Sequence, residues 1–478
     1  MITGHAATAA RLAFFVLCGL PGLVALSADD RPVVNLPKAK YSKEVIALGR
    51  ALFRDKNLSN PPGQACISCH DPSTGFTFPD SAINKEFGMA PGAMKGRFGN
   101  RKPPSLAYAP FMKSGIPYYD KDAIAWVGGL FWDGRAKNAL EQVQFPFYNP
   151  NEMNNQIHNV GHPEFVAQKL KTGPLAKLFK KAYGAKALSL PPEKLFDKVA
   201  EAIVAYEASP EVSPFTSKYD AYLEGKAELT SVELLGMRLT TGMLNGRPTG
   251  LPFKRSAHCM DCHGTSDDLR IAPDLWTNSC YANLGVPRND ASPYFKMTDQ
   301  KGNPDGYNAH GKEYIDMGLA GFIYPYYGWT PRKPHGPDPL CLIGTFKAPT
   351  LRNVDKRPNP QFVKSYMHNG YFKSLKDVVH FYNARNLTDV PGELIDYTLP
   401  NPYAVLKGKP VFPPPEYLNP NTLINPTGLS TPRGAQATVA SNPMDPDAMQ
   451  IGNLRLSEKD EDAIVAFLKC LTDGYFKR

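Results

Sequence analysis

The apolar positions of the chain repeat mostly at the three- and four-residue spacing of a helix, and few stretches alternate as a strand does. Ser42 is a suitable N-cap for the first such stretch. One face of that predicted helix comprises Val45, Ile46, Leu48, Leu52 and Phe53. Further helices are predicted near residue 139, over 164–171, 192–208 and 231–244, and after Ser374 and Ser457. The predicted fold class is mainly α.

Three long stretches lack this periodicity and are rich in glycine, proline or asparagine: 71–125, 285–340 and 399–450. We expect long irregular loops there. Residues 213–225 are expected to connect two halves of the chain. The second stretch also contains an aromatic cluster, which we interpret as local packing rather than as a binding platform. The cluster comprises Tyr324, Tyr326, Tyr327 and Trp329.

Length, composition and charge indicate which kinds of cofactor and partner the protein can have. The 478 residues are enough for two or three domains, and aromatic residues make up 11% of them, which suits a protein that encloses large flat cofactors. The formal net charge of +9 allows an acidic protein partner, but we favour ordinary solubility of an exported protein. Because lysine and arginine form no dense block, we expect no nucleic-acid partner.

The N-terminus resembles a secretory signal peptide over residues 1–27. Arg11 precedes an apolar run over 12–26, and small residues favour cleavage near Ala28. Gly19, Pro21 and Gly22 interrupt the run, which is also short, so we expect no stable membrane anchor. The predicted location is therefore the periplasm.

Two copies of one motif carry the chemistry. Cys66 and Cys69 are followed by His70, and Cys259 and Cys262 are followed by His263. This spacing is the attachment signature of c-type haem. Each thiol adds to one vinyl group of the same porphyrin, and the adjacent histidine becomes the proximal iron ligand. A redox or zinc Cys-x-x-Cys pair would explain one copy but not two, so we predict two covalently bound haem c groups.

The remaining cysteines leave disulfide pairing open. Cys18 lies in the predicted signal peptide. An exported protein can form a Cys280–Cys341 disulfide. With Cys470 the count is three, so no pairing is fixed.

Between and after the two motifs, four further segments appear in a fixed order. They are residues 131–136, 149–153, 346–353 and 366–370. In this order they resemble the bacterial di-haem cytochrome c peroxidase superfamily, most closely its MauG branch. The resemblance extends from about Leu48 to the C-terminus, apart from residues 290–340 and 400–450. The resemblance implies two cytochrome c-like haem domains with long irregular loops. The first domain would span 36–222, and the second would span 223–478 and include the loop 399–450.

The resemblance makes the first haem the peroxidatic one. It places Gln142, Pro146 and Glu152 on the open face of that haem, with Glu152 as the acid–base group for cleavage of the O–O bond and Gln142 as the group that orients ligands. Typical members carry a histidine after the first motif that blocks the iron until the partner haem is reduced. Residues 71–157 contain no histidine. We therefore expect the first iron to be open at rest.

The second haem, by the same resemblance, has His263 and Tyr382 as iron ligands, where ordinary peroxidases have a methionine in place of the tyrosine. His380 and Met367 are the alternative ligands. A tyrosinate favours ferric and higher oxidation states, whereas methionine raises the reduction potential. On the predicted helix after Ser374, helical spacing places four residues on one face: Leu375, Val378, Val379 and Tyr382. Without the resemblance, a core tyrosine would be the simpler interpretation.

Three further sites can be compared with the corresponding positions of the family. Trp132 matches the tryptophan between the two haems, where an aromatic ring can carry an oxidising equivalent as well as pack. Lys102 occupies the family's calcium-ligand position, together with Val363 and Ser365, and an ammonium group cannot bind calcium. We therefore expect no calcium there. Ala257 replaces the surface tryptophan through which MauG oxidises its partner protein, so a different reductant or exit route is expected.

The resulting functional hypothesis is a MauG-like enzyme that uses hydrogen peroxide to form a high-valent di-haem state. That state would oxidise a protein, a small molecule or an electron donor, and the identity of this reductant is unknown. The first alternative is a di-haem cytochrome c peroxidase that receives electrons from a small redox protein. The second is a non-enzymatic electron-transfer cytochrome, which would require both irons to be six-coordinate.

Overall fold

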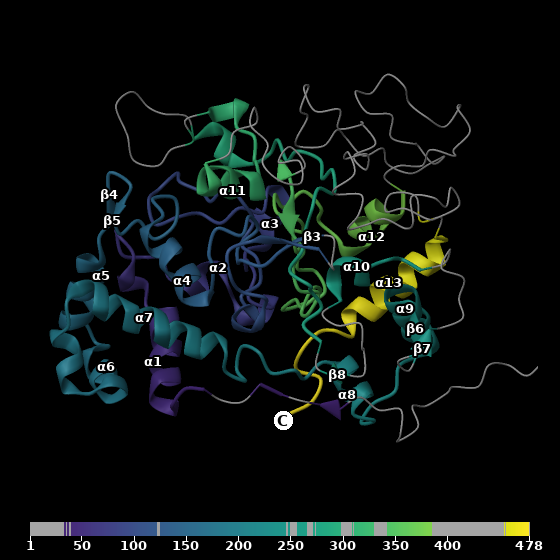
Figure 1. Ribbon diagram of the computed structural model, residues 1–478, viewed down its shortest axis with the longest axis horizontal. Coiled ribbons are helices and arrows are strands. Elements are labelled where there is room, and N and C mark those ends of the chain that lie inside the picture. Colours follow the sequence, from purple (N-terminus) through teal and green to yellow (C-terminus); the bar gives the residue numbers. More distant parts are fainter. Residues whose placement is uncertain are drawn as a thin grey trace, which may run out of the picture.

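Helices dominate the computed structural model (Figure 1). It describes residues 33–34, 36–37, 40–121, 125–244, 247–248, 256–264, 271–272, 274–297, 308, 310–328, 342–384, 454 and 456–477. In chain order the helices are α1 Lys43–Arg54, α2 Cys66–Cys69, α3 Ser81–Glu86, α4 Ala139–Tyr148, α5 Pro163–Thr172, α6 Ala176–Tyr183, α7 Pro192–Glu207, α8 Lys218–Leu223, α9 Ser231–Thr241, α10 Met260–His263, α11 Leu319–Tyr327, α12 Leu375–Ala384 and α13 Glu458–Lys469. The predicted fold class is confirmed.

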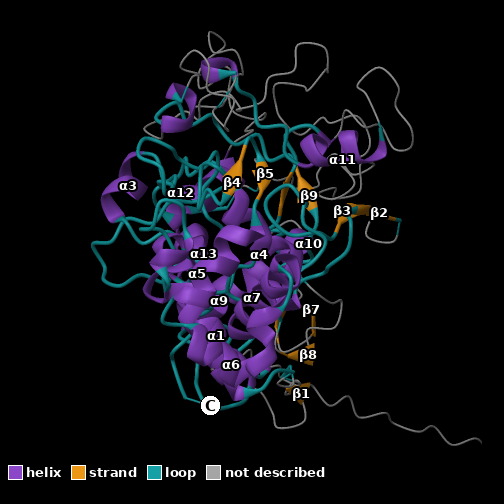
Figure 2. Cartoon of the chain, turned by 90° about the vertical axis from the view of Figure 1, so that its left-hand side faces the viewer, coloured by secondary structure: helices purple, strands orange, loops and turns teal. Residues whose placement is uncertain are grey.

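Strands are short and form only two-stranded sheets in the described part of the chain. One sheet is parallel, β1 Val33–Val34 with β8 Ile271–Ala272. The antiparallel pairs are β2 Tyr118–Asp120 with β3 Ala125–Val127, β4 Gln156–Ile157 with β5 Val160–Gly161, β6 Met243–Leu244 with β7 Arg247–Pro248, and β9 Tyr281–Ala282 with β10 Phe346–Lys347. Figure 2 shows these strands at the margins of the helical core.

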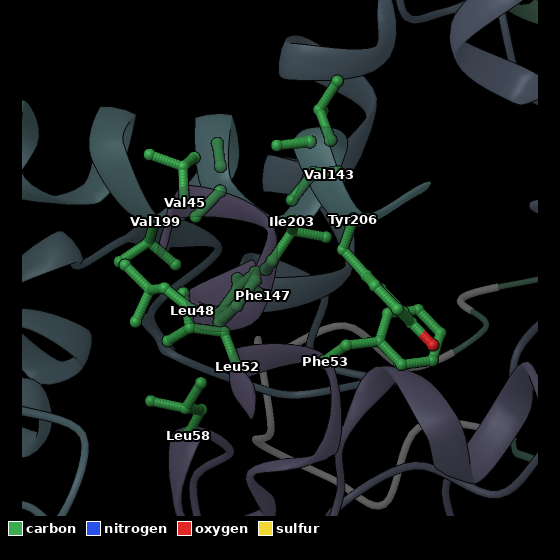
Figure 3. Close-up of a cluster of buried hydrophobic side chains, with 14 of the residues drawn as sticks. Val45, Leu48, Leu52, Phe53, Leu58, Val143, Phe147, Val199, Ile203 and Tyr206 are labelled. Carbon is green, nitrogen blue, oxygen red and sulfur yellow. The ribbon is translucent and has the colours of Figure 1, made fainter. Parts of the chain in front are cut away.

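The first hydrophobic core lies where α1 crosses α7, on the left of Figure 1. Gly49 makes this crossing possible, because a Cβ atom at Gly49 would lie 1.7 Å from the carbonyl oxygen of Ala202. Apolar side chains of α1, α4 and α7 fill the space around the crossing (Figure 3). The predicted α1 face is confirmed, since Val45, Leu48, Leu52 and Phe53 are buried.

A second hydrophobic core lies where α9 crosses α13, on the right of Figure 1. Gly236 has the same role as Gly49, because a Cβ atom there would lie 1.9 Å from the carbonyl oxygen of Ala463. Helices α8 and α12 and the ring of Trp276 complete this core. Tyr219 already packs in it, three residues before the predicted domain boundary at 222/223. The division into two domains at that boundary stays a prediction.

Buried polar groups join the two cores. Arg352 donates two hydrogen bonds to the Asp220 carboxylate, at 2.8 and 2.9 Å, and its guanidinium carbon lies 5.0 Å from the ring centre of Tyr108. The Tyr108 hydroxyl donates to Asp473, at 2.6 Å, near the end of the chain. Asp473 also accepts from Asn353, at 2.7 Å. Tyr108 packs in the first core, so this network connects it to the C-terminal half.

The predicted helices agree closely with the structure, but the expected loop 285–340 contains α11. Pro325 lies inside this helix and Gly321 in its first turns, and both residues usually interrupt a helical pattern. Burial of Leu319 and Ile323 against Tyr281 stabilises it nonetheless. Within the aromatic cluster, Tyr324 is buried, whereas Tyr326 and Tyr327 are 50% and 45% exposed. Residues 1–27, Trp329, Cys341 and 399–450 lie outside the described residues.

Candidate haem sites

The first motif forms a short helix, and the chain fixes the orientation of its histidine. Cys66 and Cys69 begin and end α2, and His70 follows as its C-cap. The Nδ1 atom of His70 lies 2.9 Å from the carbonyl oxygen of Phe76. A carbonyl can only accept, so Nδ1 carries the proton and Nε2 has the free lone pair. Burial lowers the pKa of His70 to about 4, which keeps the imidazole neutral. A neutral, oriented imidazole is what an iron ligand requires.

The structure brings the three predicted peroxidatic residues to this motif. A cavity with about 500 Å³ of empty volume, including its opening, is lined by Cys66, Cys69 and His70 and also by Gln142, Pro146 and Glu152. We call it the first cavity. Gln142 and Pro146 lie four residues apart on α4 and therefore share a helix face. His70 is the one histidine among the described residues that line it.

Glu152 lies in the turn after α4, where Asn149 holds it. The side-chain amide of Asn149 donates to the Glu152 carboxylate at 2.9 Å. Burial raises the pKa of Glu152, while the nearby Arg135 and the Asn149 hydrogen bond oppose that shift. The carboxyl group can therefore exchange a proton at a less acidic pH than a free glutamate. This is the property that an acid–base group needs.

The second motif repeats the arrangement in the C-terminal half. Cys259 caps α10, which ends with Cys262 and His263. The Nδ1 atom of His263 lies 3.0 Å from the carbonyl oxygen of Pro349 and 3.3 Å from that of Trp276. Burial lowers the pKa of His263 to about 4. The motif opens on a largely apolar cavity with about 1420 Å³ of empty volume, which we call the second cavity.

Helix α12 covers the second cavity with the face that the sequence predicted. Leu375, Val378, Val379 and Tyr382 all line the cavity. Met367 lines it as well. His380 points instead toward α13, where its Nδ1 atom lies 2.8 Å from the Glu461 carboxylate. Of the three candidate ligands, the structure therefore brings Tyr382 and Met367 to the motif and engages His380 elsewhere.

Trp132 lies between the two cavities. It lines the second cavity and also a smaller bridging cavity of about 500 Å³, which Gln142 shares with the first cavity. The indole N–H of Trp132 donates to the carbonyl oxygen of Lys102 at 2.9 Å. Lys347 lines both the second and the bridging cavity, and its backbone N–H donates to the carbonyl oxygen of Trp132 at 2.9 Å. Shared lining residues thus connect three neighbouring cavities from motif to motif.

The position that matches the family's calcium site, where we expect no calcium, contains two buried amines. Lys102 is 7% exposed, and its ammonium donates to the carbonyl oxygen of Pro103 at 3.3 Å. Burial lowers the pKa of Lys102 to about 8. Lys364, between the other two predicted positions Val363 and Ser365, donates to the carbonyl oxygens of Thr74 and Asn353, each at 2.9 Å. Lys364 was not identified from the sequence. Burial and, after it, the charge of Lys102 lower the pKa of Lys364.

The residues present suit haem at both sites. Each motif places two thiols and one neutral histidine beside a cavity, and burial raises the pKa of the Cys66 thiol to about 12, so the thiol stays protonated until it reacts. Each histidine has a backbone acceptor for its Nδ1 proton. Ala257, at the position of the missing exit tryptophan, is buried and lines the second cavity.

Comparison with known proteins agrees with this geometry. Residues 43–228 match the family of di-haem cytochrome c peroxidases that includes MauG. The chain is 30% identical over 432 residues to the methylamine utilization protein MauG of Paracoccus denitrificans, covering 90% of this chain and 89% of that protein. The chain belongs to the MauG branch of the di-haem cytochrome c peroxidase superfamily.

Other members of the superfamily are also similar. A cytochrome-c peroxidase of Pseudomonas sp. is 26% identical over 364 residues, which cover 74% of this chain and 75% of that protein. The crystal structure of the di-haem peroxidase BthA from Burkholderia thailandensis is similar with a TM-score of 0.64 and 28% identity, and covers 93% of this chain and 91% of that one. This chain is therefore a haem oxidoreductase of the peroxidase type. Its cofactor is haem, and its reactants are peroxide and a reductant.

None of the helices in the described ranges has the length and apolarity needed to cross a bilayer.

Proposed function

We propose that this member of the superfamily is a MauG-type enzyme that carries two covalently attached haem c groups and reacts with hydrogen peroxide in the fully ferric state. The observation that carries the proposal is the difference between the two cavities. Among the described residues, those that line the first cavity include Glu152, Gln142 and no histidine other than His70, whereas α12 presents Tyr382 to the second. One iron is then open to peroxide and the other is closed.

Residues of the first cavity would handle the peroxide protons. The haem, when bound, would supply a redox-active iron centre for the reaction with peroxide. Glu152 takes a proton from one peroxide oxygen and returns it to the other, so that the departing oxygen leaves as water. Gln142 donates a hydrogen bond that orients the peroxide, and Pro146 presents an apolar wall without an N–H group.

Beyond the first cavity, Trp132 provides an aromatic ring through which an oxidising equivalent passes toward the haem held by His263 and Tyr382. The buried ammonium of Lys102 takes the place of calcium. A chelator should therefore leave the spectra of both haems unchanged. Export through the predicted signal peptide would place the enzyme in the periplasm, where c-type haem is attached.

The final reductant is a protein side chain, a small molecule or an electron donor. The buried Ala257 supports an exit route other than the surface tryptophan of MauG. A second candidate function, peroxide reduction with electrons from a small redox protein, is supported by the similarity to a cytochrome-c peroxidase.

The test is to add hydrogen peroxide to the fully ferric protein and to follow the haem absorption. We expect a long-lived oxidised species without prior reduction. A reaction that requires the half-reduced protein would contradict the proposal in favour of the ordinary peroxidase. Two low-spin haems that do not react with peroxide would indicate an electron carrier.

A further inference from the structure

The first cavity contains a second carboxyl group that the sequence did not reveal. Glu207 is the last residue of α7 and is 1% exposed. It lines the first cavity together with Cys66, Cys69 and Glu152. Its Oε2 atom is buried and has no hydrogen-bond partner among the described residues. A buried carboxylate without a partner is costly in free energy, so this group is poised to hold a proton.

The position of Glu207 follows from the periodicity of α7. Val199, Ile203 and Glu207 are spaced four residues apart and lie on one helix face. Val199 and Ile203 are buried in the first core, and Ile203 also lines the first cavity. The chain thus places an ionisable group at a position where helical spacing calls for an apolar one. Such an exchange is typical of a functional rather than a structural residue.

The electrostatic surroundings agree with this placement. Burial raises the pKa of Glu207 to about 8. After burial, the charge of Glu207 is the next cause that raises the pKa of the Cys66 thiol, so the carboxyl lies near the attachment edge of the haem. Burial and the charge of Lys102 lower the pKa of His70, whereas the carbonyl groups that accept its proton oppose that shift. Glu207 is not among the causes of the His70 shift, and it lines the first cavity together with Cys66.

Other charged groups around α7 have partners of their own. Arg50 and Arg54 of α1 pair with Glu211, at 3.1 and 3.4 Å. Glu141 of α4 accepts from a backbone N–H at 2.7 Å, and Lys169 of α5 donates to a backbone carbonyl at 2.5 Å. Within the cavity, Glu152 is held by its asparagine, and the thiols lose their protons permanently when the thioether bonds form. Glu207 has no such engagement through its Oε2 atom.

We propose that Glu207 is a second proton-holding carboxyl of the first cavity, which takes up a proton when the first haem is reduced and releases it when that haem is oxidised. This deepens the proposed function and rests on haem attachment at Cys66 and Cys69. The balance is simple. Iron gains one electron from the reductant, Glu207 forms one O–H bond with a proton from solvent, and the net charge of the buried site is unchanged. Oxidation reverses both changes.

The test is the midpoint potential of the first haem as a function of pH. One proton taken up per electron lowers the potential by about 59 mV for each tenfold fall in proton activity. We expect this slope in the natural protein between the pKa of Glu207 in the oxidised state and its higher pKa in the reduced state, since only there does reduction add a proton. The slope should be lost in Glu207→Gln, which keeps the size of the side chain, and retained in Glu207→Asp. An unchanged slope in Glu207→Gln would overturn the proposal.

Glu152→Gln is the matched comparison, because it removes the other carboxyl of the same cavity. It should slow the reaction with peroxide and leave the pH slope in place. Loss of the slope in Glu152→Gln alone would assign the proton to Glu152 and refute the role of Glu207. If Glu207→Gln attaches no haem, the infrared difference spectrum of the natural protein decides. Reduction should produce the C=O band of a protonated carboxyl that shifts in Glu207→Asp, and an unshifted or missing band would refute the proposal.

These measurements need haem but no peroxide. Failure of the ferric protein to react with peroxide would therefore count against the proposed function and leave the proton coupling standing. A pH-independent potential in a protein that reacts as proposed would count against Glu207 alone.

Discussion

The two halves of the molecule share one frame but line their cavities with different side chains. In each half a glycine, Gly49 or Gly236, lets two helices cross at backbone contact, and a short helix then presents two thiols and a histidine to a cavity. In each half a backbone carbonyl fixes that histidine. The halves differ in what faces the histidine. Gln142 and Glu152 line the first cavity, whereas the face of α12 that lines the second is apolar apart from Tyr382.

This difference shows that the frame does not determine the chemistry of either site. The crossing helices position the motif, which would supply the attachment and the proximal ligand. Under the proposed function, the segments that cover the opposite side, α4 with its following turn in one half and α12 in the other, would decide whether an iron is open or closed. Substitutions in the covering segments should therefore change reactivity, and substitutions in the frame should change stability.

The largest effect is expected from Glu152→Gln, which breaks the polar character of the first cavity. The rate constant for the reaction with peroxide should fall by about 10²–10⁴-fold, because the amide cannot transfer a proton. Stopped-flow absorption of the haems measures this rate. The matched control is Glu141→Gln on the preceding helix α4. The Glu141 carboxylate accepts from the backbone N–H of Lys137 and is not among the residues that line the first cavity, so its loss should leave the rate unchanged. Equal rates for the two variants would contradict the role of Glu152.

Next in size is Arg352→Met, which breaks the polar connection between the halves. It leaves the Asp220 carboxylate buried without its partner, so the free energy of unfolding should fall by about 3–5 kcal/mol. Denaturation by urea measures it. Lys194→Met, which removes an exposed ion pair at 3.4 Å on the surface of α7, should cost less than about 1 kcal/mol. A cost for Arg352→Met no greater than that of Lys194→Met would refute the connection.

The ion pair between Arg352 and Asp220 should also make the free energy of unfolding depend on pH. Burial raises the pKa of Asp220, but the charge and hydrogen bonds of Arg352 outweigh it and lower the pKa overall. The pair therefore stabilises the fold fully above the unfolded pKa of about 3.9, and this contribution is lost as the pH falls toward the lower folded value. Unfolding at several acidic pH values should show this loss in the natural protein. Arg352→Met should lack it, and an identical acid dependence in both would contradict the assignment.

A smaller effect is expected from Gly49→Ala and Gly236→Ala, which test whether the two frames are equivalent. Each added methyl group would overlap a backbone oxygen, so each variant should lose about 2–3 kcal/mol of unfolding free energy. Gly99→Ala is the control, because the nearest atom to its Cβ position lies at 3.5 Å. If Gly49→Ala and Gly236→Ala lose no more unfolding free energy than Gly99→Ala, close contact between the crossing helices is not required.

The sequence predicted most of the frame and part of each site. Helical spacing identified the buried face of α1 and the cavity face of α12, because both depend on local periodicity. It missed α11, whose helix forms through tertiary burial despite Pro325. It also missed Glu207, although a glutamate at an apolar position of α7 is a visible signal. Lys364 could not be found from local pattern, since its carbonyl partners come from distant segments.

The most direct test of the account is the spin state of the two ferric haems in the natural protein and in Tyr382→Phe, measured by electron paramagnetic resonance. The account predicts one high-spin and one low-spin signal at rest. In Tyr382→Phe the low-spin signal should be lost or altered, while the high-spin signal of the first haem stays as it was. Two low-spin signals at rest, or a low-spin signal that Tyr382→Phe leaves unchanged, would contradict it.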